Sequence, residues 1–150
     1  MLRIFAYLLT FNASKLKKLL SIKYSPHAFN TAMLLLRVCI GILMMSHGFG
    51  KLQGYGKNHS DFMNFLGMGS TVSYTLVVFA EFFCALFVVI GLFTRVSCIP
   101  LIITMGVALF KAHNGELFGD GETSAIYLVC FVVILLLGPG KFSIDGMAGK

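Results

Sequence analysis

Residues 71–93 read TVSYTLVVFAEFFCALFVVIGLF, and this stretch decides the class of the protein. It is almost entirely apolar, and Glu81 is its only charged residue. A transmembrane helix needs about 20 consecutive apolar residues to cross the hydrocarbon core of a bilayer. The stretch therefore predicts a membrane-spanning helix with one carboxylate inside it.

Three further apolar runs lie on either side of this stretch. They cover about 31–49, 96–110 and 123–137, and Arg37 is the only charge in the first of them. Short connections, such as the turn GLFTR after the second run, make neighbouring helices antiparallel. The sequence therefore predicts an all-α integral membrane fold, an antiparallel bundle of four transmembrane helices.

The composition agrees with this fold class. The chain is 57% hydrophobic and 12% charged, whereas a soluble domain carries about 25% charged residues. The net charge of +6 comes largely from the two ends of the chain, which fits a membrane surface and gives no reason to expect nucleic acid as a partner. The four cysteines stand alone in apolar runs without zinc-binding spacing, so we expect buried small hydrophobic side chains and no metal site.

We divide the chain into an N-terminal cytoplasmic or interfacial segment (1–30), a membrane domain (31–140) and a cytoplasmic tail (141–150). In the first segment Leu16, Leu19 and Leu20 share one helical face against neighbouring lysines, which predicts an interfacial N-terminal helix. The loop 50–70 carries Phe62, Phe65 and Leu66 on one helical face, so we expect a second short interfacial helix there.

The basic residues predict the orientation of the bundle. With the N-terminus inside, eight basic residues lie on the cytoplasmic side, namely Arg3, Lys15, Lys17, Lys18, Lys23, Arg95, Lys141 and Lys150. Three lie on the outer side, namely Lys51, Lys57 and Lys111. This asymmetry follows the positive-inside rule and predicts that both termini are cytoplasmic.

Arg37 and Glu81 are the two charges inside the predicted spans. A charge at a helix centre costs about 2.5–3.5 kcal/mol on insertion scales, and antiparallel packing of the first two spans would bring these two to similar depth. We therefore predict that Arg37 and Glu81 pair, either to fix helix register or as part of a ligand or proton site. Small residues that permit close helix contact lie on the same two spans: Gly41, Gly48, Ala80 and Ala85.

A second group of polar residues falls at the outer ends of the spans. The group comprises His47, Lys51, Tyr74, His113, Glu116 and Glu122. Convergent polar groups at the mouth of a bundle favour a small-ligand pocket. Each residue also has a simpler interpretation, because interfacial His, Tyr and Lys anchor helix ends and the two glutamates can merely shape a loop. Metal binding is a further alternative, and haem fits less well because two rim histidines would leave the macrocycle poorly buried.

Several motifs together resemble the DoxX family of small bacterial membrane proteins. They are LLRVCIGILMMSHGFGKL in the first span, AEFFCALFVVIGLFTR across the second, VALFKAH closing the third and GPGKFSIDG after the fourth. The resemblance implies a bacterial inner-membrane protein with four helices. It marks a set of positions in this chain: His47, Lys51, Glu81, Arg95, His113, Pro139, Gly140 and Asp145. In the tail we expect Pro139 and Gly140 to end the fourth helix and Asp145 to pair with Arg95.

Two functions follow as hypotheses. In the first, the protein is a subunit of an oxidoreductase or respiratory-type complex that handles a quinone or a small redox substrate, since the family takes its name from a quinone-linked complex. His47 or His113 would exchange protons with the ligand, Lys51 or Arg37 would stabilise negative charge, and Glu81 would hold Arg37 or relay protons. In the second, the protein is a non-enzymatic assembly or scaffolding subunit. Lipid and either a larger complex or further copies of the chain are the expected partners, and a transporter is a weaker third reading.

Overall fold

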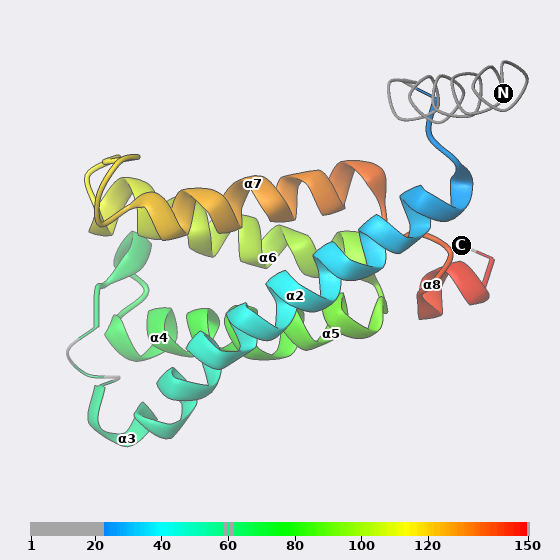
Figure 1. The fold of residues 1–150 in the computed structure, drawn as a ribbon. Coiled ribbons are helices and arrows are strands. Elements are labelled where there is room, and N and C mark those ends of the chain that lie inside the picture. Colours follow the sequence, from blue (N-terminus) through cyan, green and yellow to red (C-terminus); the bar gives the residue numbers. More distant parts are fainter. Residues whose placement is uncertain (1–22, 59, 61, 150) are drawn as a thin grey trace, which may run out of the picture.

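The structure is a computed structural model that describes residues 23–149 except 59 and 61. The interfacial helix expected near Leu16 lies outside the described residues. All regular structure in the described part is helical, and no strand occurs in it. Figure 1 shows long helices running side by side, with the short helix α8 (Ile144–Met147) at one end and α3 (Tyr55–Asn58) at the other.

Four long helical segments make up the bundle. The first is α2 (Pro26–Gln53). The second is continuous through α4 (Ser70–Val78), the π-helical turn η2 (Phe79–Cys84) and α5 (Ala85–Ile90). The third joins α6 (Thr94–Val107) to a second π-helical turn, η3 (Ala108–Ala112), and the fourth is α7 (Glu122–Leu137).

Three of these segments are long and apolar enough to cross a membrane: Pro26–Gln53, Ser70–Ile90 and Thr94–Ala112. The fourth, Glu122–Leu137, is an apolar helix of 16 residues, which is about 24 Å long. That is less than the hydrocarbon thickness of about 30 Å, so the fourth crossing remains a prediction.

The sequence predicted the positions of these helices, but the predicted bounds of the first helix were too short. We predicted a span over 31–49, whereas α2 covers Pro26–Gln53 because Ser25 caps its first turn by accepting a hydrogen bond from Ala28 N–H at 3.1 Å. The short helix expected around Phe62, Phe65 and Leu66 forms only in part within the segment 60–68. Among the described residues of that segment, only the 3₁₀ turn η1 (Phe65–Gly67) is helical.

Two glycines set how α2 packs against the second segment. A Cβ atom built on Gly48 would lie 2.6 Å from the backbone carbon of Glu81, and one built on Gly41 would lie 2.5 Å from the Val89 side chain. Backbones approach this closely only where one partner lacks a side chain. The two glycines are seven residues apart, about two turns, so together they fix the register of α2 along η2 and α5.

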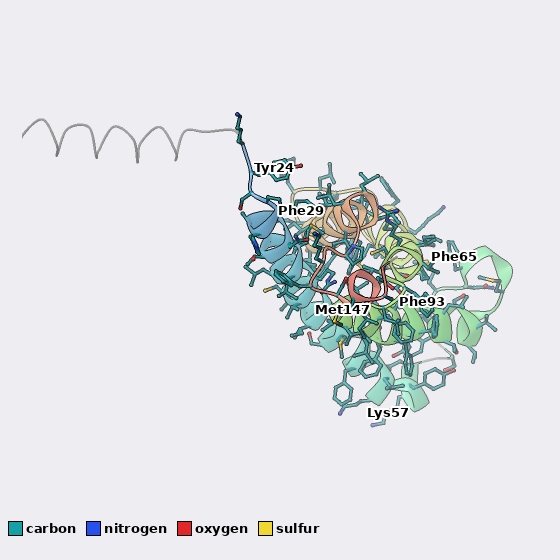
Figure 2. The ribbon with its side chains drawn as sticks, turned by 90° about the vertical axis from the view of Figure 1, so that its right-hand side faces the viewer. Tyr24, Phe29, Lys57, Phe65, Phe93 and Met147 are labelled. Atoms are coloured by element: carbon teal, nitrogen blue, oxygen red, sulfur yellow. The ribbon has the colours of Figure 1, made fainter. Side chains whose placement is uncertain are left out.

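The remaining core lies between α6, α7 and the inner faces of α2 and α5. It is built from closely packed apolar side chains, including Met44, Val88, Leu101, Phe131 and Ile134. All five are at most 1% exposed. The outer faces carry many exposed Leu, Ile, Val and Phe side chains, as expected for helices surrounded by lipid. Figure 2, viewed from the end that carries Phe93 and Met147, shows α8 over the middle of that end of the bundle.

Candidate functional site

A pocket of about 330 Å³ lies between α4, η2, α6 and η3, next to the loop 62–68. Its volume is at the lower end of the range for ligand sites, about 300–1,000 Å³. Most of its wall is apolar, and five polar or charged side chains interrupt that wall: Lys51, Ser73, Glu81, Thr104 and His113. A mostly apolar cavity with a few polar groups is the usual form of a small-molecule site.

The Lys51 ammonium and the Glu81 carboxylate form an ion pair on this wall. Lys51 Nζ donates to Glu81 Oε1 at 2.5 Å and to Oε2 at 2.6 Å. The carboxylate side chain is only 3% exposed, whereas the lysine side chain is 35% exposed. Glu81 is therefore a buried charge that depends on its partner, and Lys51 connects the pocket to the surface.

The predicted pair between Arg37 and Glu81 is wrong. Arg37 lies 14 residues before Lys51 on α2, which is about 21 Å along the helix axis. Its guanidinium donates from Nη1 to the Pro139 carbonyl at 2.9 Å and from Nη2 to the Phe142 carbonyl at 2.8 Å. Arg37 is 1% exposed and does not line the pocket, so its interactions hold the C-terminal tail against α2.

Asp145, which we expected to pair with Arg95, binds the start of α6. Its carboxylate accepts hydrogen bonds from the backbone N–H groups of Phe93 and Thr94 at 3.0 and 2.9 Å, and from the Thr94 hydroxyl at 3.0 Å. It thereby caps the start of α6, where unpaired N–H groups favour an acceptor. The Arg95 guanidinium lies over Gly138, 3.3 Å from the position of a Cβ atom there.

The end of the fourth helix lies in the same region. α7 ends at Leu137, and Gly138 and Gly140, on either side of Pro139, both have positive φ angles of 81° and 75°. The chain then turns back so that Lys141 N–H donates to the Asn30 side chain at 2.8 Å. These contacts of residues 138–145 with α2 and the start of α6 lie at the opposite end of the bundle from the pocket, and they have a structural role.

Tyr74 lies behind the ion pair rather than on the pocket wall. It is 3% exposed, and its hydroxyl donates to the Lys51 carbonyl at 2.8 Å. Its ring packs against those of Tyr55 and Phe62, with centroid distances of 5.5 and 5.1 Å. Tyr74 therefore positions the end of α2 from which Lys51 reaches Glu81.

His113 and Thr104 both present polar groups to the pocket. Neither the imidazole nor the Thr104 hydroxyl forms a hydrogen bond to any residue within the described part of the chain. His113 follows η3 directly, and its N–H donates to the Ala108 carbonyl at 3.1 Å in the wider π-type pattern. Both groups are on the pocket wall, so a ligand there has two unengaged hydrogen-bonding partners.

The two π-helical turns border the same pocket. Glu81 lies in η2, and both Ala108 and Ala112 of η3 contribute to the opposite side of the wall. A π turn adds one residue to a helical turn and widens it, and such turns are frequent at functional sites. The irregular backbone is therefore concentrated where the candidate ligand groups lie.

The other predicted site residues lie outside the pocket. His47 is exposed, and its ring meets the edge of Tyr127 at a centroid distance of 5.8 Å. Glu116 and Glu122 are exposed in and after the loop that joins η3 to α7. The structure thus brings Lys51, Glu81 and His113 together, and it separates His47, Arg37 and the two loop glutamates from them.

Sequence reasoning did not select Ser73 or Thr104. Ser73 is 3% exposed; its hydroxyl donates to the Gly69 carbonyl and accepts from Phe65 N–H at 3.0 Å, so it holds the loop beside the pocket. In the sequence, each of the two could have been recognised only as a single small polar residue inside an apolar run. That signal is weak, because Ser and Thr in membrane helices often bond only to their own backbone.

Comparison with known proteins decides the family. The sequence pattern of the DoxX family matches residues 32–114 of this chain, which is more than half of its length and includes Lys51, Glu81 and His113. The chain belongs to the DoxX family. It is also similar to the inner membrane protein YqjF of Escherichia coli (strain K12), with 27% identity over 130 residues that cover 81% of this chain and 95% of that protein. No solved structure matches this DoxX protein.

Proposed function

We propose that this DoxX protein is an inner-membrane subunit of an oxidoreductase complex that binds a quinone, or a small redox molecule of similar chemistry, in the pocket. The observation that supports this most strongly is the juxtaposition of the Lys51–Glu81 pair and the unengaged His113 imidazole on an apolar wall. A quinone is a neutral ring with two carbonyl oxygens, so it matches an apolar cavity with a few hydrogen-bonding groups.

The chemistry assigns a role to each of these side chains. Reduction of a quinone to a quinol takes up two electrons and two protons. His113 as an imidazolium donates one proton to a quinone oxygen, and the Lys51 ammonium stabilises the negative charge that develops on that oxygen. Glu81, a carboxylate in the pair, first takes up a proton from the solvent beside the partly exposed Lys51 and then passes this second proton to the ligand. The electrons come from a partner subunit with a redox cofactor, since the sequence of this chain contains no flavin or haem motif.

Quinone binding to the purified protein in nanodiscs tests this function. We expect the parent protein to bind a quinone with a decyl tail, and His113→Ala and Thr104→Val to weaken binding by about tenfold each, since each loses one hydrogen bond to the ligand. His27→Ala and Thr31→Val are the matched controls, because both residues are exposed and outside the pocket. Absence of quinone binding by the parent protein would refute the proposal.

The orientation belongs to the same proposal. We place both termini in the cytoplasm because of the excess of basic residues at the ends of the chain, and α7 then forms the fourth crossing. The pocket end, with Lys51 and His113, faces outward. Single cysteines at Lys57 and Lys141 in a cysteine-free variant should react with a membrane-impermeant maleimide from outside and from inside the cell, respectively, and the reverse pattern would invert the assignment.

One observation favours the alternative, an assembly subunit without its own ligand. Phe118 is 96% exposed at the tip of the loop between η3 and α7, and its neighbour Leu117 is 52% exposed. Isolated apolar side chains this exposed on a polar loop can serve as contacts for another protein. If the parent protein binds no quinone, and Phe118→Ser releases a membrane partner that the parent retains through purification, the assembly function is the correct one.

A further inference from the structure

The pocket extends from the loop end of the bundle to the middle of the membrane helices. Ile103 is the tenth of the nineteen residues of Thr94–Ala112, and Glu81 lies one residue past the centre of Ser70–Ile90. Both residues line the pocket. Because the hydrocarbon core is about 30 Å thick, the inner half of the cavity lies at the depth of lipid chains rather than at the water interface.

At this depth the wall of the pocket also forms part of the outer surface of the bundle. Leu76 on α4 and Ile103 on α6 both contribute to the wall, and they are 49% and 54% exposed. A residue that lines a cavity and is half exposed marks an edge where the cavity meets the surroundings. In a bilayer those surroundings are acyl chains, so we call the gap between Leu76 and Ile103 the lateral mouth.

The loop end of the pocket is held by several interactions. Phe65 N–H donates to Ser73 Oγ at 3.0 Å, and Gly69 N–H donates to the Asn64 side chain at 2.8 Å. The Phe62 ring packs edge-on against Tyr74 at a centroid distance of 5.1 Å. These contacts fix apolar side chains of the loop against the pocket on the side nearest to water.

The polar groups inside limit the charge of the ligand. Lys51 and Glu81 neutralise each other, and the unengaged groups, the Thr104 hydroxyl and the His113 imidazole, suit hydrogen bonds. An ionic headgroup would lose its hydration without gaining an uncompensated opposite charge, and that desolvation is strongly unfavourable. The pocket therefore favours a neutral headgroup that forms hydrogen bonds.

We propose that the ligand enters this pocket sideways from the bilayer through the lateral mouth, and that it is a neutral, lipid-soluble molecule whose apolar tail remains between Leu76 and Ile103. This inference rests on the proposed function only in assuming that the pocket binds a ligand. It adds the route of entry, the position of the tail, and two side chains that control access.

Tryptophan substitutions test the route, because the chain contains no tryptophan of its own. Ile103→Trp narrows the mouth, and Ile99→Trp is the matched control, one turn away on the same exposed face of α6 and outside the pocket. In nanodiscs, Ile103→Trp should slow association of a decyl-tailed quinone by about tenfold and leave a tailless, water-soluble quinone headgroup unaffected. Ile99→Trp should slow neither probe.

Two outcomes would overturn the lateral route. One is an unchanged association rate of the tailed quinone in Ile103→Trp, and the other is equal slowing of the tailed and tailless probes, which would mean that the substitution merely fills the pocket. A second measurement does not depend on any ligand. The new indole of Ile103→Trp should be quenched by brominated acyl chains as strongly as that of Ile99→Trp, and quenching by aqueous acrylamide instead would show that the mouth faces water.

The two proposals fail separately. If the parent protein binds neither quinone, the proposed function is wrong, and bromine quenching alone decides whether the mouth faces the hydrocarbon. If the parent binds both probes but the tailed one enters normally past Ile103→Trp, the function stands and the lateral route is wrong.

Discussion

Removal of either partner from the Lys51–Glu81 pair should have unequal consequences. Lys51→Met leaves a carboxylate that is 3% exposed without its cation, and breaking a buried pair in this way costs about 3–5 kcal/mol. Glu81→Gln leaves a lysine that is 35% exposed and whose ammonium can turn to the polar surface, so we expect a loss of about 1 kcal/mol. In Lys51→Met/Glu81→Gln, the loss should be smaller than the sum of the two by about 1–2 kcal/mol.

The cysteines of the core provide the assay. Cys84 and Cys98 are 3% and 0% exposed, so they react with a fluorogenic maleimide only when the bundle opens. Unfolding in detergent micelles is then followed as an increase in fluorescence above the signal from Cys39, which is exposed in the folded protein. Lys57→Met, which removes an exposed lysine of α3, is the control and should change stability by less than about 0.5 kcal/mol.

Two results would refute the reasoning: equal losses of stability in the two single variants, or additive losses in the double variant. If Glu81→Gln is as destabilising as Lys51→Met, the different burial of the two side chains does not govern the cost. If the double variant loses the sum of the two single losses, the two groups do not interact in the folded protein, and the pocket wall is not built as described.

Three further predictions concern close packing and hydrogen bonds elsewhere in the bundle. Gly48→Ala should destabilise the bundle by about 1–3 kcal/mol through overpacking, because its Cβ atom would lie 2.6 Å from the Glu81 backbone. Gly50→Ala is the control, since open space surrounds Gly50, and it should leave the unfolding signal of the maleimide assay unchanged. Tyr74→Phe should cost about 0.5–1.5 kcal/mol for the lost hydrogen bond and weaken quinone binding through the misplaced lysine, and unchanged binding would contradict its positioning role. Asp145→Ala should lower stability by about 0.5–2 kcal/mol as the cap of α6 is lost, without changing quinone affinity, since Asp145 is far from the pocket.

The sequence was sufficient to predict helices in a membrane and roughly where they lie. Runs of apolar residues long enough to cross the hydrocarbon core have few other interpretations, and the three long apolar helices of the structure follow those runs. The start of α2 was missed because the segment 26–30, PHAFN, is less apolar than the run that follows. Ser25 and Pro26 are nevertheless a typical helix start, with a hydroxyl cap before a proline in the first turn.

The pairing of the buried charges could not be derived from depth alone. We assumed that the first two spans are centred at the same height, which places Arg37 opposite Glu81. In the structure Arg37 lies beside Gly91 instead, a shift of ten residues or about 15 Å along the helix. The register is set by the close contact of Gly48 with Glu81, and the pattern of apolar residues in a membrane helix contains no information on which glycine faces which neighbour.

The pocket was predictable in part. Lys51 and His113 stood out because they belong to a set of polar residues from different spans that converge at one end of the bundle. The π turns η2 and η3 were not predictable, since each arises from one additional residue in a helix and has no distinct local sequence. They affect which side chains of the second and third segments face the cavity. His47, one turn before Lys51 on α2, lies outside the site although its sequence position suggested otherwise.

Zero-length crosslinking within the membrane tests most directly which cation neutralises Glu81. A hydrophobic carbodiimide enters the bilayer, activates a buried carboxyl group and allows an adjacent amine to form an amide with loss of one water molecule. The structure, with Lys51 Nζ at 2.5 Å from Glu81 Oε1, predicts that mass spectrometry will find the peptides containing Lys51 and Glu81 joined, and that Lys51→Arg will abolish the product. A stable carbodiimide adduct on Glu81 with no link to Lys51 would contradict the account.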